Sequence, residues 1–178
     1  GGTVVSVVPE LGFYRVALPE GEDVVRYAQT LLGDSRVSTA EVNGLATIAE
    51  GQQSSVAFSE GKHIWPDVHD QDALLRVGAR RAQKEADGEG VIVAILDTGI
   101  SLDHPALAGS LALPGIEPGV ALAPGAERAE HVDSNQDGTA DGALGHGTHI
   151  AGIVLAVAPR ARLLPVRVLD SDGVGTAF

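Results

Sequence analysis

Two short stretches carry the side chains best suited to acid–base chemistry: "AILDTG" with Asp97, and "GHGTHIAGI" with His146 and His149. Asp97 directly follows an apolar run, and the carboxyl ends of strands are where open α/β sheets gather reactive groups. His146 stands between two glycines where a helix is expected to begin. A carboxylate that accepts the Nδ1 proton leaves Nε2 of the ring free as a general base. We therefore predict that Asp97 orients His146, with capping of the next turn as the alternative for Asp97 and a structural role for His149.

A third stretch, "DSNQDGTADG", has the spacing of a calcium-binding loop, with oxygen-bearing side chains at alternate positions and Gly138 at the turn. The last position, where such loops carry a bidentate Glu, is Leu144, so one ligand is missing from the pattern. An acidic, glycine-rich surface loop is the alternative interpretation. The predicted Ca²⁺ ligands are Asp133, Asn135, Asp137, the carbonyl of Thr139, and Asp141.

The elements that must position these residues form a predicted α/β unit. The run at 91–96 is typical of a strand buried on both faces of a parallel sheet. The spacing of apolar residues predicts a helix over 146–158, and 161–169 predicts a second buried strand. Strand, long crossover, helix and strand make a βαβ unit. A further helix is predicted over 73–86.

The N-terminal region predicts a small α+β domain. Strands are expected at 3–8, 12–18 and 36–42, and a helix is expected between Pro19 and Gly33. Residues 51–72 are polar, contain Gly and Pro, and lack periodicity, which indicates a linker. The predicted domains are residues 1–50, the linker 51–72, and residues 73–178.

The composition argues against several classes of partner. There are 24 acidic and 12 basic residues, which gives a formal net charge of −12. Nucleic acids and anionic membrane surfaces require a basic footprint, so we predict neither as a partner. The longest apolar runs fall far short of the ~18 residues of a membrane span. No cysteine is present, so disulfides and thiolate chemistry are absent from the chain.

"VIVAILDTGISLDHPAL" followed by "GHGTHIAGIVLAVAP" resembles the subtilisin-like serine peptidases, or subtilases. The resemblance covers about residues 70–178 and implies an incomplete parallel-sheet α/β catalytic domain in which Asp97 and His146 belong to an Asp-His-Ser triad. Residues 1–50 look like the latter part of the family's ferredoxin-like α+β propeptide, an intramolecular chaperone and inhibitor. "VRVLDSDGVGTAF" resembles the segment that pairs with extended substrates, which implies substrate binding at Gly173, Val174 and Gly175.

The resemblance also implies peptide or protein substrates, bound calcium, export from the cell, and self-cleavage within 50–72. The sequence departs from the family because it contains neither the Gly-Thr-Ser-x-Ala serine nor the oxyanion Asn. Ala106 replaces a frequent Asp of one family calcium site. We expect the nucleophile in a C-terminal part of the catalytic domain outside this chain, on the same polypeptide or a separate one, and no activity from this chain alone.

Two alternatives come from other functional classes. The chain could be a non-catalytic propeptide or inhibitor module joined to a pseudo-enzyme remnant. It could also be a metal hydrolase in which Asp97, His146 and His149 are the ligands. A downstream Gly-Thr-Ser-x-Ala segment would favour the peptidase, and stoichiometric zinc would favour the hydrolase.

Overall fold

The computed structural model describes residues 1–48, 72–112 and 125–176. The chain divides into two compact units, one of Gly1–Leu45 with Thr176–Phe178 and one of Ala46–Gly175. The predicted linker lies outside the described residues except for Asp72. The fold is of the predicted α/β type, with a parallel strand pair in the second unit.

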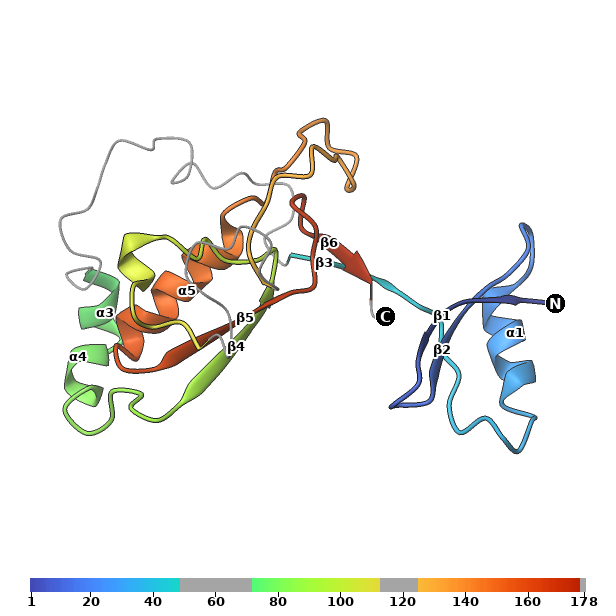
Figure 1. The fold of residues 1–178 in the computed structure, drawn as a ribbon, viewed down its shortest axis with the longest axis horizontal. Coiled ribbons are helices and arrows are strands. Elements are labelled where there is room, and N and C mark those ends of the chain that lie inside the picture. Colours follow the sequence, from blue (N-terminus) through green and yellow to red (C-terminus); the bar gives the residue numbers. More distant parts are fainter. Residues whose placement is uncertain (49–71, 113–124, 177–178) are drawn as a thin grey trace. The chain divides into compact units, whose positions relative to one another are not determined.

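The first unit is a hairpin and one helix (Figure 1). Strand β1 (Thr3–Val8) pairs with β2 (Phe13–Ala17) in antiparallel register. Helix α1 (Val24–Leu31) begins where the Asp23 carboxylate accepts hydrogen bonds from two backbone amides, because the first N–H groups of a helix have no partner within it.

The strand predicted at 36–42 is wrong. The side chain of Asp34 accepts a hydrogen bond from the Arg36 amide, and the Val37 amide donates to the Asp34 carbonyl. This local turn competes with an extended conformation, as Asp side chains commonly do. A short strand, β3 (Leu45–Thr47), follows instead and is paired with β6 (Val174–Thr176).

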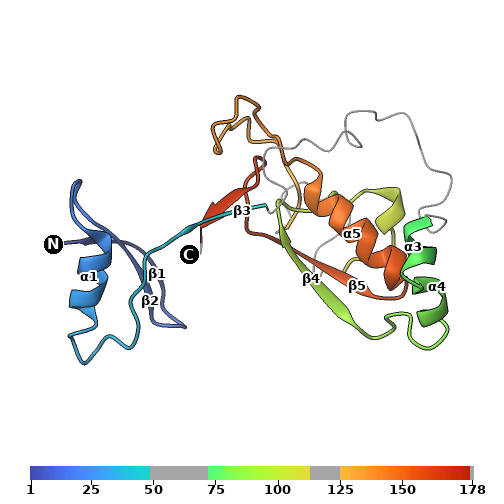
Figure 2. The same cartoon turned by 180° about the vertical axis from the view of Figure 1, so that it is seen from behind.

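The second unit is built on two parallel strands and one long helix (Figure 2). Strand β4 (Ile92–Asp97) pairs with β5 (Arg162–Arg167), and this register places Asp97 opposite Arg167. Helix α5 (His146–Val157) packs on β4 and on the short 3₁₀ helix η2 (Pro105–Leu107). Its buried residues Ala151 and Leu155 join Ile95 and Leu163 of the two strands in one core cluster.

The helix predicted over 73–86 is interrupted. The structure has α3 (Asp72–Arg76) and α4 (Ala79–Ala82) in its place. Between them Gly78 has φ +72°, a left-handed conformation that ends a right-handed helix and that glycine adopts without steric cost.

The expectation that β4 is buried on both faces is also wrong for this chain. Ile95 and Asp97 are buried, whereas Ile92 and Leu96 are 61% and 62% exposed. The alternation arises because α5 covers one face and no other described element covers the opposite one.

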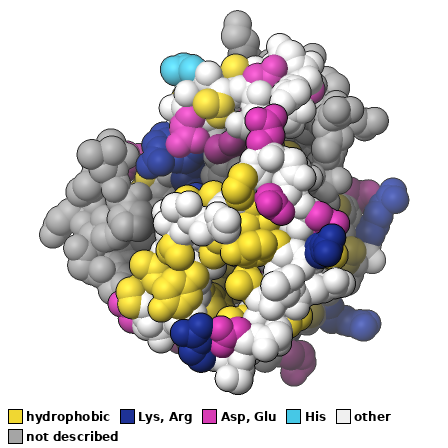
Figure 3. Space-filling model, turned by 90° about the vertical axis from the view of Figure 1, so that its right-hand side faces the viewer, with side chains coloured by type: hydrophobic (Ala, Val, Ile, Leu, Met, Phe, Trp, Pro, Cys, Tyr) yellow, Lys and Arg dark blue, Asp and Glu magenta, His cyan; other side chains and the backbone are white. Residues whose placement is uncertain are grey.

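The first unit exposes much of its apolar surface. Residues 1–45 are all described, and none of them is buried. Val4, Phe13 and Tyr14 of the hairpin are 51–63% exposed. Figure 3 shows hydrophobic side chains gathered on one face of the molecule. A unit this small buries too little apolar surface to be strongly stable by itself.

Among residues 1–48, 72–112 and 125–176, no helix has both the length and the apolar character needed to cross a bilayer.

Candidate active site

The structure brings together the carboxylate and the imidazole that the sequence analysis paired. Asp97 is the last residue of β4, and His146 is the first residue of α5. Nδ1 of His146 lies 2.9 Å from both Oδ1 and Oδ2 of Asp97. The two side chains are 10% and 17% exposed, so little water competes for the contact. This geometry suits a carboxylate that accepts the Nδ1 proton, and the catalytic role of the pair stays a prediction.

Gly147 explains why the helix can approach the strand this closely. A Cβ atom at Gly147 would lie 2.2 Å from the Gly99 carbonyl oxygen and 3.1 Å from Oδ1 of Asp97. The first of these distances is far inside van der Waals contact. The glycine after His146 is therefore required by the close approach of α5 to the turn that follows Asp97.

The residue after Asp97 is fixed from several sides. Thr98 is fully buried, and its amide donates a 2.7 Å hydrogen bond to Oδ1 of Asp97. Its hydroxyl donates to the Ala143 carbonyl at 3.3 Å and lies 3.4 Å from the Gly147 amide nitrogen, which donates to it. The carboxylate thus also caps its own turn, as the alternative interpretation of Asp97 expected, while it faces His146.

A second side-chain contact joins α5 to the same turn. Thr148 accepts a hydrogen bond from the Ser101 amide at 2.8 Å and donates one to the Glu127 carboxylate at 2.9 Å. Sequence analysis did not select either Thr148 or Glu127. The position of Thr148 between the two histidines was the one available signal.

An extended segment lies against the residues that the resemblance assigns to substrate. The Ile48 amide donates a 3.1 Å hydrogen bond to the Gly173 carbonyl, next to the β3–β6 pairing. Gly173 has φ +79°, and a Cβ atom at Gly175 would lie 2.4 Å from the Val168 carbonyl oxygen. Both glycines are therefore required by the backbone geometry of this edge. Substrate binding at Gly173, Val174 and Gly175 stays a prediction.

The predicted calcium loop is a tight, hydrogen-bonded turn. The side chain of Asp133 accepts from the amides of Asp137 and Gly138, and the Asn135 side chain also accepts from the Asp137 amide. The Thr139 amide donates to the Asp137 carboxylate. Gly138 has φ +90°, as the turn position requires.

Asp141, the remaining predicted calcium ligand, makes hydrogen bonds to residues outside the 133–139 loop. Its carboxylate accepts hydrogen bonds from the amides of Glu130 and His131 and from the hydroxyl of Ser171. The hydrogen bond from Ser171, more than the two amides and His131, holds the pKa of Asp141 below its ordinary value. Within the described residues no three His, Cys, Asp or Glu side chains converge as metal ligands. The residues present therefore fit a calcium site only in part, and the calcium assignment stays a prediction.

The loop before α5 is also tied to the segment that leads into β6. Asp172 is 2% exposed, and its two oxygens accept from the amides of Asn135 and Gly142. The Ser171 carbonyl accepts from the Ala143 amide. These contacts fix the calcium-like loop to the residues just before Gly173.

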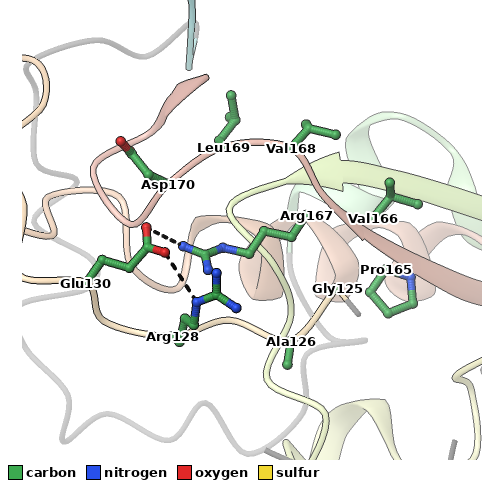
Figure 4. A pocket seen from close by; sticks show the side chains of 10 residues that line it. All are labelled: Gly125, Ala126, Arg128, Glu130, Pro165, Val166, Arg167, Val168, Leu169 and Asp170. Atoms are coloured by element: carbon green, nitrogen blue, oxygen red, sulfur yellow. Dashed lines mark hydrogen bonds and ion pairs between the residues drawn. The ribbon is translucent and has the colours of Figure 1, made fainter. Parts of the chain in front are cut away.

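An open pocket of about 580 Å³ is lined by residues from 125–130 and 165–170 (Figure 4). Neither Asp97 nor His146 lines this pocket. Arg167 and Arg128 both point toward the carboxylate of Glu130. Nη2 of Arg167 forms an ion pair with Oε2 of Glu130 at 2.8 Å. Burial alone would raise the pKa of Glu130, but Arg167, helped by Arg128 and Ser171, outweighs burial and lowers it.

Sequence analysis missed Arg167 and Glu130. Arg167 interrupts the otherwise apolar run "LLPVRVL", and its side chain is only 10% exposed. A charge within a strand expected to be buried is the signal that was available, because such charges are rarely buried without a partner.

Fold and site together define a subtilase: the family model of the subtilase family matches residues 88–178, and the chain belongs to this family. Residues 1–43 match the model of the fervidolysin N-terminal prodomain. Both parts of the resemblance seen in the sequence are therefore confirmed.

The chain is similar to proteins named as subtilisins, alkaline proteases and thermitase. Thermitase of Thermoactinomyces vulgaris is 37% identical over 111 residues, which cover 57% of this chain and 34% of thermitase. Subtilisin BL of Lederbergia lenta is 43% identical over 112 residues, which cover 57% of this chain and 35% of that protein. Subtilisin E of Bacillus subtilis (strain 168) is 32% identical over 136 residues, which cover 68% of this chain and 30% of that protein. The chain thus spans about a third of the length of these relatives.

Proposed function

We propose that the chain is the N-terminal part of a serine endopeptidase of the subtilisin type. The observation that carries the proposal is the 2.9 Å contact between Nδ1 of His146 and both carboxylate oxygens of Asp97, in a chain of the subtilase family. Asp97 would hold the ring in the tautomer that leaves Nε2 unprotonated. His146 would then take the proton of a serine hydroxyl as that hydroxyl attacks the peptide carbonyl, and return it to the leaving amine.

The 178 residues contain no Gly-Thr-Ser-x-Ala segment, so we propose that the serine and the oxyanion Asn of that mechanism lie outside them and that the chain alone is inactive. Loss of a triad member leaves a residual acceleration of about 10³–10⁴ over water, which itself depends on the oxyanion hole. The exposed face of β4, with Ile92 and Leu96, is the surface that the rest of the catalytic domain would cover.

We further propose that residues 1–50 act as a propeptide, joined through the linker 51–72 to a catalytic part that begins near residue 73. The match of residues 1–43 to a prodomain model supports this division. The hydrogen bond between Ile48 and Gly173 supports the view that the last residues of the propeptide lie along the substrate edge and block it before cleavage. A propeptide of this kind is typical of exported peptidases, so export is part of the proposal.

Calcium binding at the 133–139 loop is proposed as a stabilising and not a catalytic function. Asp133, Asn135 and Asp137 would supply side-chain oxygens and Thr139 its carbonyl, the hard ligands that Ca²⁺ prefers. The bound ion would neutralise the carboxylates of Asp133 and Asp137.

The acid–base pair is tested in the chain itself by ¹⁵N NMR of the histidine rings. We expect His146 in the Nδ1-protonated tautomer at neutral pH, with Asp97→Asn changing the ring ¹⁵N shifts of His146 and His149→Gln leaving them unchanged. A wild-type ring protonated on Nε2 alone, or an Asp97→Asn variant with unaltered shifts, would remove the proposed mechanism.

Activity is tested in two settings. The isolated chain is incubated with a chromogenic peptide, and turnover above that of a His146→Ala variant would contradict the proposed inactivity. The chain is then fused, in place of the corresponding region, to the C-terminal part of subtilisin BL, which contributes the remainder of the domain. We expect peptidase activity that Asp97→Asn reduces by about 10⁴.

A further inference from the structure

Three backbone and side-chain contacts from the end of β5 and the two residues after it converge on the residues at the end of β4. The amides of Val168 and Leu169 both donate to the Asp97 carbonyl, at 3.0 and 3.2 Å. Nε of Arg167 donates to the Thr98 carbonyl at 3.0 Å. The carbonyls of Asp97 and Thr98 are thus held by three consecutive residues, the last residue of β5 and the two that follow it.

Arg167 is the one side chain among these contacts. Register places it directly opposite Asp97, and its side chain is nine-tenths buried. Its Nη1 and Nη2 atoms have no hydrogen-bond partner among the described residues, and Nη2 is compensated by the ion pair with Glu130. A buried guanidinium with one carboxylate costs desolvation energy that a neutral side chain would not, so stability alone is a poor reason for an arginine here.

Thr98 connects the arginine to the carboxylate. Its amide donates to Oδ1 of Asp97 while its carbonyl accepts from Arg167. The two hydrogen bonds hold the peptide groups on either side of Thr98, so the position of this residue is set at both its amide and its carbonyl. The same carboxylate lies against His146.

We propose that Arg167 is a positioning residue for the Asp97–His146 pair, acting through the Thr98 carbonyl, with Glu130 as the counter-charge that allows the guanidinium to be buried. This inference rests on the proposed function of that pair. The contacts of Arg167 are with the Thr98 carbonyl and with Glu130, and not with the ring, so its proposed effect is on the orientation of the carboxylate.

The test separates positioning from simple structural support. Arg167→Met removes both contacts and leaves the half-buried Glu130 with Arg128 as its remaining cationic partner, so this variant is expected to lose stability. The double variant Arg167→Met/Glu130→Gln removes the ion pair as a unit and is expected to recover most of that loss. Arg162→Met is the matched control, because Arg162 lies on the same strand and donates to the Leu111 carbonyl from an exposed position.

Two local readouts are followed in the full chain: hydrogen exchange at the Thr98 amide and the ring ¹⁵N shifts of His146. In the double variant we expect Thr98 exchange on the order of tenfold faster, the effect of losing one charge-assisted hydrogen bond, together with changed His146 shifts. Arg162→Met should leave both readouts unchanged. Arg167→Lys, which keeps the charge but not the planar fork, should give an intermediate result.

Wild-type values of both readouts in a folded double variant would show that Arg167 is structural and overturn the inference. If Arg167→Met and the double variant both fail to fold, the same two readouts are measured in Arg167→Lys. Wild-type values in that variant would likewise overturn the inference. Failure of the proposed function is distinct, because it appears as a His146 ring unaffected by Asp97→Asn whatever Arg167 does.

Discussion

The closest approach at the site gives the sharpest prediction, which concerns Gly147→Ala. A Cβ atom there would lie 2.2 Å from the Gly99 carbonyl oxygen, whereas real Cβ atoms essentially never come within 3.0 Å of another heavy atom. The start of α5 must therefore move by about 0.8 Å, the gap between those two distances. A movement of that size along the Asp97–His146 contact lengthens 2.9 Å to about 3.7 Å, beyond a hydrogen bond.

The expected energy follows from two opposing effects. Overpacking against backbone costs up to about 3 kcal/mol, because the carbonyl cannot rotate away as a side chain could. Replacing glycine by alanine inside a helix stabilises the folded state by about 1 kcal/mol, because alanine has the higher helix propensity. The expected net destabilisation of Gly147→Ala is therefore about 2 kcal/mol.

Gly152→Ala provides the matched control. Gly152 lies in the same helix, and nothing lies within 4 Å of a Cβ atom built there. Only the helix propensity operates at this site, so we expect a stabilisation of up to about 1 kcal/mol. Urea unfolding followed by circular dichroism measures both variants, and ring NMR of His146 reports the pair. A Gly147→Ala variant as stable as Gly152→Ala, with unaltered His146 shifts, would refute the reasoning.

Three further predictions concern charge, metal and capping. The lowered pKa of Glu130 stabilises the folded state above its unfolded pKa of about 4.3, and this stability is lost as pH falls through the folded pKa. Urea titrations from pH 7 to 3 should thus show a shallower acid decline for Glu130→Gln than for wild type, and parallel curves would contradict this. Calcium should raise the melting temperature, with about 2.7 kcal/mol gained at a hundredfold excess over the dissociation constant, and Asp133→Asn/Asp137→Asn should abolish the rise. No rise at about 10 mM Ca²⁺, well above the affinities of weak extracellular sites, would remove the calcium assignment. Asp23→Ala removes the side chain that accepts hydrogen bonds from two amides at the start of α1. We expect this variant to lower the free energy of unfolding by about 0.5–2 kcal/mol, measured from the loss of helical circular dichroism in urea. A smaller effect for Asp23→Ala than for Asp23→Asn would contradict the capping role.

The sequence was sufficient for the elements whose patterns are local and periodic. Helix α5 and strands β4 and β5 lie within a few residues of their predicted bounds, because each presents a regular apolar face over at least six residues. The prediction failed where a single local contact outweighs the pattern. A local turn at Asp34 replaces the start of the strand predicted at 36–42. The left-handed conformation of Gly78 interrupts the helix predicted over 73–86.

Sequence patterns also identified the two stretches that contain Asp97 and His146, but they did not reveal the residues that hold these stretches in place. Arg167, Thr148 and Asp172 act through contacts with residues 21 to 69 positions away, and no local pattern contains such contacts. Asp141 stays a predicted calcium ligand, and only the structure shows that its carboxylate accepts a hydrogen bond from Ser171.

The amino-acid sequence by itself determined which reactive side chains the chain carries, their order, and the βαβ unit that holds them, because these depend on residue type and short-range periodicity. The tertiary structure alone decided that Asp97 and His146 meet at 2.9 Å although 49 residues separate them. It also decided that Gly147 must lack a side chain and that Arg167 lies opposite the carboxylate. The reason is physical: a hydrogen bond depends on tenths of an ångström, and only the packing of α5 and β5 against β4 sets positions on that scale.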